Sequence, residues 1–215
     1  MGTLNSLALQ LGEIRSRGVQ IAVVIGAGNI WRGAEKQDAM SRPNADMIGM
    51  LATVVNALAL RGALENSAIP ACVLSAIEFK PVVEVQHVEA YVGRHAVKYL
   101  QEGKIVIFAG GTGNPYFTTD TAAALRALQI EANVLLKATK VDGVYSSDPL
   151  VDPKAKRFPK LSLEQALQMG LKVMDASAFS LCKENNLPIV VFALVPEGNI
   201  RKVVSGEEIG TILTP

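Results

Sequence analysis

This chain of 215 residues has almost no excess of basic over acidic residues and few aromatic residues or cysteines, and each of these features argues against a class of function. The chain has 21 Lys and Arg against 20 Asp and Glu, and only 5% of its residues are aromatic. Nucleic-acid-binding proteins usually carry a basic excess or stripe, so no nucleic-acid partner is expected. The two cysteines, Cys72 and Cys182, form no CxxC pair, which argues against a zinc site or a disulfide framework.

Histidine and long apolar runs are also scarce. His87 and His95 offer little to a Ser-His-Asp or Cys-His nucleophile system. Mean hydropathy is +0.27, yet no apolar run reaches the about 18 residues that a membrane-spanning helix requires. The first residues do not combine a basic segment with an apolar one, so no signal peptide is expected. These absences predict a cytoplasmic protein that needs no membrane partner.

Short apolar runs alternate with longer helical patterns, which predicts an α/β protein. Residues 20–25 are apolar, rich in β-branched residues and followed by Gly26, as expected of a buried parallel strand. This alternation predicts one domain, 1–215, with a mostly parallel sheet between two layers of helices. Further strands are expected at 70–74, 104–109, 133–138, 188–194 and 210–213. Helices are expected at 4–17, 47–66, 84–102, 119–131, 162–169, 176–186 and 199–205, and a polar loop after Gly143.

The loop after the first strand reads GAGNIWRG at residues 26–33. Glycines let backbone N–H groups approach an anion, and Arg32 suits phosphate oxygens. The loop is not a dinucleotide fingerprint, because Trp31 stands where the third glycine belongs. Asp46, twenty residues after Gly26, does not follow a second strand as the ribose-binding acid of that motif would. A phosphate-binding loop of another kind is therefore expected, with a purely structural turn as the alternative.

The loop after the 104–109 strand reads GGTGNPYFTTD at residues 110–120. Thr119 or Asp120 could cap the helix that follows, which is the structural alternative for either residue alone. The whole segment supplies hydroxyls, N–H groups and flat rings, but no strong base. It therefore predicts a loop that binds a small ligand.

The fourth strand leads into KATKVDGVYSSDP at residues 137–149. Lys137 lies in an apolar strand, where a lysine is costly unless its head reaches an anion or solvent. Reaching solvent is the structural alternative. No nucleophile and base accompany these loops, so the combination favours phosphoryl transfer, which depends mainly on positioning and charge neutralisation.

These segments together resemble the bacterial UMP kinase (uridylate kinase) family of the amino-acid-kinase fold. The resemblance rests on GAGNIWRG, the D-x-x-G-M-L-A-T-V-x-N pattern at 46–56, GTGNPYFTTD, KATKVDGVYSSDP, Val173-Met174-Asp175 and the closing Gly206-Glu207 and Gly210-Thr211. It implies a three-layer αβα sandwich and transfer of a phosphoryl group from Mg-ATP to UMP in pyrimidine nucleotide synthesis. It also implies regulation by GTP and UTP, whose sites no motif locates here.

The resemblance assigns roles to individual residues of this chain. The half at about 1–120 is expected to bind UMP, with Asp46 on the ribose, and the half at about 121–215 to bind ATP. The UMP-binding residues are Ala27, Asp46, Thr112, Gly113, Asn114, Pro115, Tyr116, Phe117, Thr118 and Thr119. The ATP-binding residues are Gly28, Arg32, Thr139, Tyr145 and Asp148. The catalytic residues are Lys137, Asp120 and Arg32. Ala27 replaces a common glycine, which a backbone contact tolerates if φ is negative.

Two further expectations concern the start of the chain and its assembly. The family begins with a K-L-S-G-E strand that wraps the transferred phosphoryl group, and this first strand is absent here. A truncated start is expected; a non-catalytic nucleotide-binding module and another small-molecule kinase of the same fold are the alternatives. Residues 47–60 are apolar nearly all round, which predicts that helix 47–66 packs against the same helix of a second copy. The resemblance extends this dimer to a hexamer, a trimer of dimers; the alternative is a helix buried by its own domain.

Overall fold

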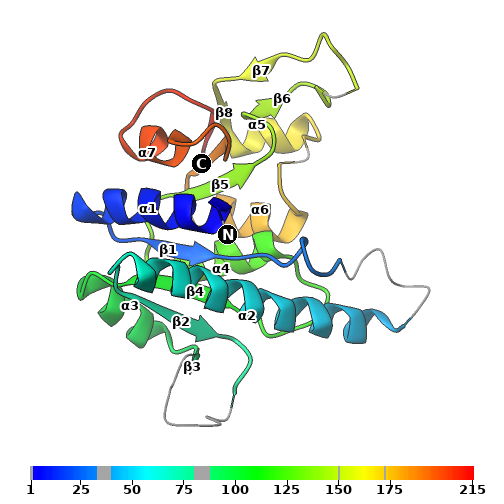
Figure 1. The fold of residues 1–215 in the computed structure, drawn as a ribbon. Helices are drawn as coiled ribbons and strands as arrows, with labels where there is room; N and C mark the ends of the chain where they lie inside the picture. The colour runs from blue at the N-terminus through cyan, green and yellow to red at the C-terminus, as the bar shows by residue number, and fades with distance from the viewer. Residues whose placement is uncertain (1, 33–39, 80–87, 150, 172) are drawn as a thin grey trace. The chain divides into compact units, whose positions relative to one another are not determined.

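The computed structural model describes residues 2–32, 40–79, 88–149, 151–171 and 173–215 (Figure 1). The chain forms two compact units, Met1–Arg126 and Ala127–Pro215. The division falls within helix α4 (Thr119–Gln129), close to the predicted division after residue 120. The assignment of UMP to one half and ATP to the other stays a prediction.

The first unit is built on a fully parallel sheet of four strands in the order β1-β4-β2-β3. All five residues of the inner strand β4 are buried, as its unbroken apolar run predicts. Ile107 pairs with Val23 of β1 on one side and with Val73 of β2 on the other. The strands are β1 (Ala22–Val24), β2 (Ala71–Ser75), β3 (Glu89–Ala90) and β4 (Ile105–Ala109).

Helices α1 (Gly2–Ser16), α2 (Arg42–Asn66) and α3 (Gly93–Gln101) complete this unit together with most of α4 (Figure 1). One face of α2 packs on the sheet: Val54, Leu60 and Leu64 belong to a buried cluster with Ile105 and Ile107. The opposite face of α2 exposes five large apolar side chains, Met47, Ile48, Leu51, Val55 and Leu58. The division of α2 into a buried face and an exposed face fixes how the helix lies on the sheet, and with it the direction of the polar side chains of α2 that are described below.

Helix α2 is also long and apolar enough, by length and composition alone, to cross a membrane. In this structure 44% of its most apolar 18-residue window is buried within the protein. Its buried face is part of the core just described, so the same apolar content serves packing against the sheet.

The second unit contains a mixed sheet in the order β5-β9-β10-β8 and a small antiparallel pair, β6 and β7. Strand β9 is parallel to β5 and antiparallel to β10, and β8 is parallel to β10. The strands are β5 (Leu135–Thr139), β6 (Val144–Tyr145), β7 (Arg157–Phe158), β8 (Lys160–Ser162), β9 (Ile189–Ala193) and β10 (Thr211–Thr214). The helices are α5 (Leu163–Gln168), α6 (Ala176–Glu184) and α7 (Asn199–Val204).

The predicted α/β class and mostly parallel strand order are confirmed, and three element predictions need correction. The helix expected at 84–102 begins only at Gly93, after β3 and an extended Val92; residues 84–87 lie outside the described residues. Helix α2 begins at Arg42 instead of 47, with a proline in its first turn. The loop expected after Gly143 contains β6 and β7, which are too short to show a strand period in the sequence.

Candidate active site

Two loops of the first unit leave the same edge of its sheet. Strands β1 and β4 are parallel neighbours, so the segments 25–32 and 110–118 both start at their carboxyl ends. Helix α2 presents Asp46, Thr53 and Asn56 to these loops. Their spacing of seven and three residues places the three polar side chains on one face of the helix.

Asn56 and Ala45, both in α2, hold the first loop in place through hydrogen bonds. The amide nitrogen Nδ2 of Asn56 donates to the backbone oxygen of Gly26 at 2.7 Å and to Asn29 Oδ1 at 2.8 Å. Trp31 Nε1 donates to the backbone oxygen of Ala45 at 2.9 Å. Gly26 and Trp31 of this loop are therefore both attached to α2, which explains how the irregular segment between them keeps a defined shape.

Close approach, rather than a positive φ, explains Gly26. A Cβ added there would lie 3.3 Å from Thr119 Oγ1, so the two loops nearly touch at this point. Ala27 does not have a positive φ, and its side chain is buried, so its methyl group is accommodated as the sequence predicts. Arg32 is exposed and its Nε donates to the backbone oxygen of Gly28 at 3.2 Å.

Thr53 anchors the start of the second loop. Its buried Oγ1 accepts a hydrogen bond from Gly110 N at 2.8 Å and donates to the backbone oxygen of Met50 at 2.6 Å. Gly110 has a φ of +74°, and a Cβ there would lie 3.0 Å from Ile77 N. Only glycine fits this position, because a side chain would be strained and crowded.

Asp46 anchors the middle of the same loop. Its Oδ2 accepts a hydrogen bond from Tyr116 N at 2.8 Å and from Arg42 Nε at 2.7 Å. Tyr116 has a φ of +73°, uncommon for a residue with a side chain. The rings of Tyr116 and Phe117 are 63% and 51% exposed, so they present flat apolar surfaces to solvent.

The rest of the second loop is held by local turns. Thr112 Oγ1 accepts from Asn114 N at 3.2 Å. Thr118 Oγ1 accepts from the N–H groups of Asp120 and Thr121 at 3.1 and 3.2 Å, and so caps α4. The sequence-based expectation that Thr119 or Asp120 caps this helix is wrong, because the helix starts at Thr119 itself. The other loop residues assigned to UMP, Gly113 and Pro115, lie within the same segment.

Arg126 is a buried cation behind the glycine loop that the sequence analysis did not single out. Its side chain donates to the backbone oxygen of Gly111 at 3.3 Å and its guanidinium lies 3.8 Å from the centre of the Tyr91 ring. Burial lowers the pKa of the Arg126 guanidinium. The signal was present, since Arg126 stands alone among Ala and Leu, as Lys137 does among apolar strand residues.

The predicted ATP residues are divided between the two units: Gly28 and Arg32 lie in the first loop of the first unit, whereas Thr139, Tyr145 and Asp148 lie at or after the carboxyl end of β5 in the second unit. Lys137 is half-buried and its Nζ donates to the backbone oxygen of Val173 at 2.7 Å. Thr139 Oγ1 accepts from Val141 N at 3.1 Å, and Asp148 is exposed. The catalytic assignment of Lys137 stays a prediction, since the partner that this structure gives its head is a backbone carbonyl.

Thr211 holds the β6–β7 pair against the second sheet. Its fully buried Oγ1 accepts from Val144 N at 2.8 Å and donates to the backbone oxygen of Phe158 at 2.5 Å. Beside it, Tyr145 donates its hydroxyl to Asp142 Oδ1 at 2.5 Å, and this bond raises the pKa of Tyr145. Thr211, from the closing motif, therefore positions the segment that carries Tyr145.

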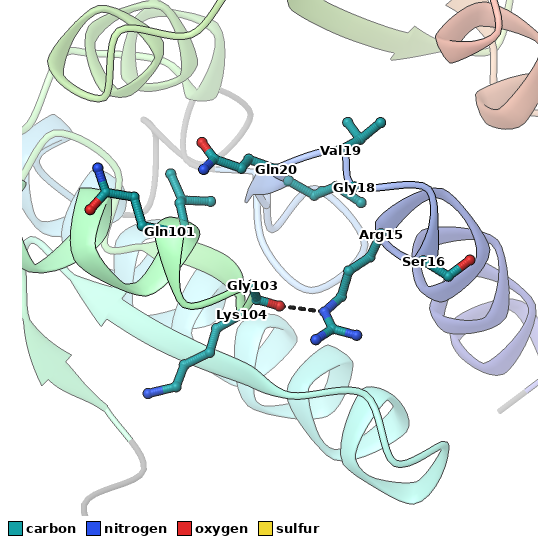
Figure 2. A pocket seen from close by; sticks show the side chains of 10 residues that line it. Arg15, Ser16, Gly18, Val19, Gln20, Gln101, Gly103 and Lys104 are labelled. Atoms are coloured by element: carbon teal, nitrogen blue, oxygen red, sulfur yellow. Dashed lines mark hydrogen bonds between the residues drawn. The ribbon is translucent and has the colours of Figure 1, made fainter.

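Two cavities among the described residues lie at the other ends of the strands. One of about 410 Å³ is lined by Arg15, Gln20 and Lys104, where β1 and β4 begin, and Arg15 Nε donates to the backbone oxygen of Gly103 (Figure 2). One of about 460 Å³ includes Pro188, at the start of β9. The loops at the carboxyl ends carry the polar groups assigned to nucleotides, so we assign the candidate site to these loops and not to the two cavities.

The thiols and the acidic residues restrict the chemistry further. Burial raises the pKa of Cys72 and of Cys182 to about 11, so both thiols are protonated at neutral pH and are poor nucleophiles. Among the residues that the structure describes, no group of three or more His, Cys, Asp or Glu side chains could hold a metal ion. The loops of the first unit offer backbone N–H groups, hydroxyls and Arg32, and the second unit carries Lys137.

Comparison with known proteins identifies the relatives of this fold. Residues 1–193 match the sequence model of the amino acid kinase family. The crystal structure of UMP kinase from Ureaplasma parvum is 38% identical and has a TM-score of 0.91, covering 99% of this chain and 88% of that one. UMP kinase from Bacillus anthracis is 36% identical with a TM-score of 0.92, covering 98% and 86%. Uridylate kinase from Archaeoglobus fulgidus is 28% identical with a TM-score of 0.75, covering 98% and 91%.

Proposed function

Because the chain belongs to the amino acid kinase family, we propose that it is a UMP kinase, a phosphotransferase that converts UMP and Mg-ATP into UDP and ADP. One observation carries the choice of substrate. Asp46, assigned to the ribose, and Tyr116, in the segment assigned to UMP, are 70 residues apart and share a hydrogen bond of 2.8 Å. The residue assigned to the ribose and the loop assigned to UMP are therefore in contact. The chain is also similar to UMP kinases over nearly its full length.

In the proposed reaction a phosphate oxygen of UMP attacks the γ-phosphorus of ATP. A bond forms between that oxygen and the γ-phosphorus, the bond to the β,γ-bridging oxygen breaks, and ADP leaves with the electron pair. The attacking oxygen is already ionised at neutral pH, so no general base is required. Positioning and charge neutralisation suffice; the first unit supplies N–H groups and Arg32 for this purpose, and the second unit supplies Lys137.

Mg²⁺ is proposed to arrive with ATP and to neutralise the charge of its phosphates. Mg²⁺ bound in this way needs one or two carboxylates at most, and the acidic residues assigned to the reaction are Asp46 and Asp120 in the first unit and Asp148 in the second. The same proposal places the reaction in the cytoplasm, in pyrimidine nucleotide synthesis, with no nucleic acid or membrane as partner.

We also propose a homodimer formed through the exposed apolar stripe of α2, within a larger hexamer. Leu51, Val55 and Leu58 are 43%, 59% and 38% exposed on one side of this helix. Val55→Glu is expected to dissociate the assembly in light scattering, and Leu9→Glu, at an exposed apolar position on α1, is the matched control. The neighbouring Val54 is unsuitable for such a test because its side chain is buried in its own unit. A monomeric mass for the unmutated chain at micromolar concentration contradicts this part of the proposal.

The direct test is transfer of the labelled γ-phosphate of ATP to a panel of acceptors. We expect transfer to UMP to exceed transfer to AMP, GMP, aspartate and carbamate. Transfer to another acceptor identifies a different kinase of the same fold. Binding of UMP without transfer identifies a non-catalytic nucleotide-binding module.

A further inference from the structure

We propose that Arg42 is a positioning residue for the acceptor nucleotide, acting through Asp46. This inference rests on the proposed function. Arg42 precedes Asp46 by one helical turn in α2, and its Nε donates to Asp46 Oδ2 at 2.7 Å. The same oxygen accepts from Tyr116 N at 2.8 Å, so one carboxylate oxygen joins the first turn of α2 to the middle of the second loop.

The shared oxygen fixes the direction of the whole carboxylate. Two donors on Oδ2, one of them a guanidinium, restrain rotation about the last bond of the Asp46 side chain. A carboxylate has about four acceptor positions, so Oδ1 keeps the capacity to accept from a hydroxyl group such as those of ribose. The side chain of Asp46 is 13% exposed and that of Arg42 is 33% exposed, so the carboxylate is the more shielded member of the pair.

Arg42 also lies against the part of the loop that is conformationally costly. A positive φ at a residue with a side chain is strained and persists only where surrounding contacts enforce it, and Tyr116 has a φ of +73°. The guanidinium of Arg42 lies 5.8 Å from the centre of the Tyr116 ring, within the range of a cation–π contact. Arg42 therefore supports both the carboxylate that holds the Tyr116 backbone and the ring of the same residue.

The same helix contains a matched control pair. Arg61 Nε donates to Glu65 Oε1 at 2.7 Å, again across one helical turn. The pair thus repeats the spacing and distance of Arg42 and Asp46. If Arg42 merely stabilised α2, Arg61→Met would act as Arg42→Met does, so the comparison separates positioning from helix stability.

The first experiment needs no ligand and measures hydrogen–deuterium exchange at the Tyr116 amide. In Arg42→Met we expect exchange to be roughly tenfold faster, because the carboxylate that accepts from this N–H loses its orientation. In Arg61→Met we expect the wild-type rate. Equal exchange in the wild type and Arg42→Met, or equal acceleration in both variants, overturns the proposal.

The second experiment measures UMP affinity by calorimetry. Arg42→Met is expected to raise the Kd for UMP by roughly 10- to 100-fold, as for loss of a charged hydrogen bond, and Arg42→Lys to recover part of the affinity. In the double variant with Asp46→Asn, the effect should not exceed that of the stronger single variant, since both act through one carboxylate. Effects that multiply, or an unchanged Kd, overturn the proposal. If the unmutated chain binds no UMP, the proposed function fails, while exchange at Tyr116 still decides whether Arg42 holds the loop.

Discussion

Replacing Thr53 by valine tests whether α2 holds the glycine loop through a single hydroxyl. Thr53 and Gly110 are both buried, and Gly110 N donates to Thr53 Oγ1 at 2.8 Å. Valine keeps the size and branching of threonine but cannot accept this hydrogen bond. The N–H of Gly110 would then be buried without that acceptor.

The structure sets the size of the expected effect. A buried donor that loses its partner costs about 1–3 kcal/mol, which equals a change of about 5- to 150-fold in the folding equilibrium. The hydrogen bond that Thr53 Oγ1 donates to the backbone oxygen of Met50 contributes less to stability, because that oxygen also accepts a hydrogen bond within α2. Thr53→Ser keeps the hydroxyl and loses one methyl group, which costs about 0.8 kcal/mol.

The assay is urea unfolding followed by the fluorescence of Trp31, the one tryptophan of the chain, which lies in the first unit. We expect Thr53→Val to lower the free energy of unfolding by about 1–3 kcal/mol, and Thr53→Ser to lower it less. A valine variant as stable as the wild type, beside a less stable serine variant, would show that the methyl group and not the hydroxyl determines this position.

Three further predictions concern the second unit and the thiols. Gly210→Ala should prevent stable folding of the second unit in circular dichroism, because the new Cβ would lie 2.3 Å from the backbone oxygen of Val191 at a φ of +85°; a variant with wild-type stability contradicts this. Lys137→Met should reduce phosphoryl transfer by about 100-fold or more with the fold retained, as for loss of one electrostatic contact to a reacting group; wild-type turnover would refute that role. Cys72 and Cys182 should resist alkylation in the folded protein at pH 8 and react after unfolding. Burial raises the pKa of both thiols in the folded protein to about 11. Their contribution to stability is therefore fully present below about pH 9 and is lost as the pH rises towards 11. If a Cys182→Ala variant loses as much stability over this pH range as the wild type, Cys182 does not contribute to the loss.

Much of the fold could be predicted from the sequence because local patterns determine it. The β4 run is apolar at every position, and such a run is stable only as an inner strand of a covered sheet. The turn at Gly110 and Gly113 could also be predicted locally, because both residues have a positive φ that other residues do not adopt easily. The short β3, β6 and β7 could not be predicted, because a strand of two residues exists only through pairing with a distant segment.

The candidate site, too, could be predicted from the sequence only in part. The sequence determined which segments carry phosphate-binding and hydroxyl groups, since these are properties of residue types at strand ends. Only the tertiary structure decided that Asp46 reaches Tyr116, 70 residues away, and that Arg42 shares the same carboxylate oxygen. Likewise, the composition of α2 predicts an apolar helix, but whether Val54 or Val55 faces the core depends on how the helix lies on its sheet. Residue types and their spacing are local, whereas the partner of a hydrogen bond and the buried side of a helix are fixed by packing between segments that are distant in the chain.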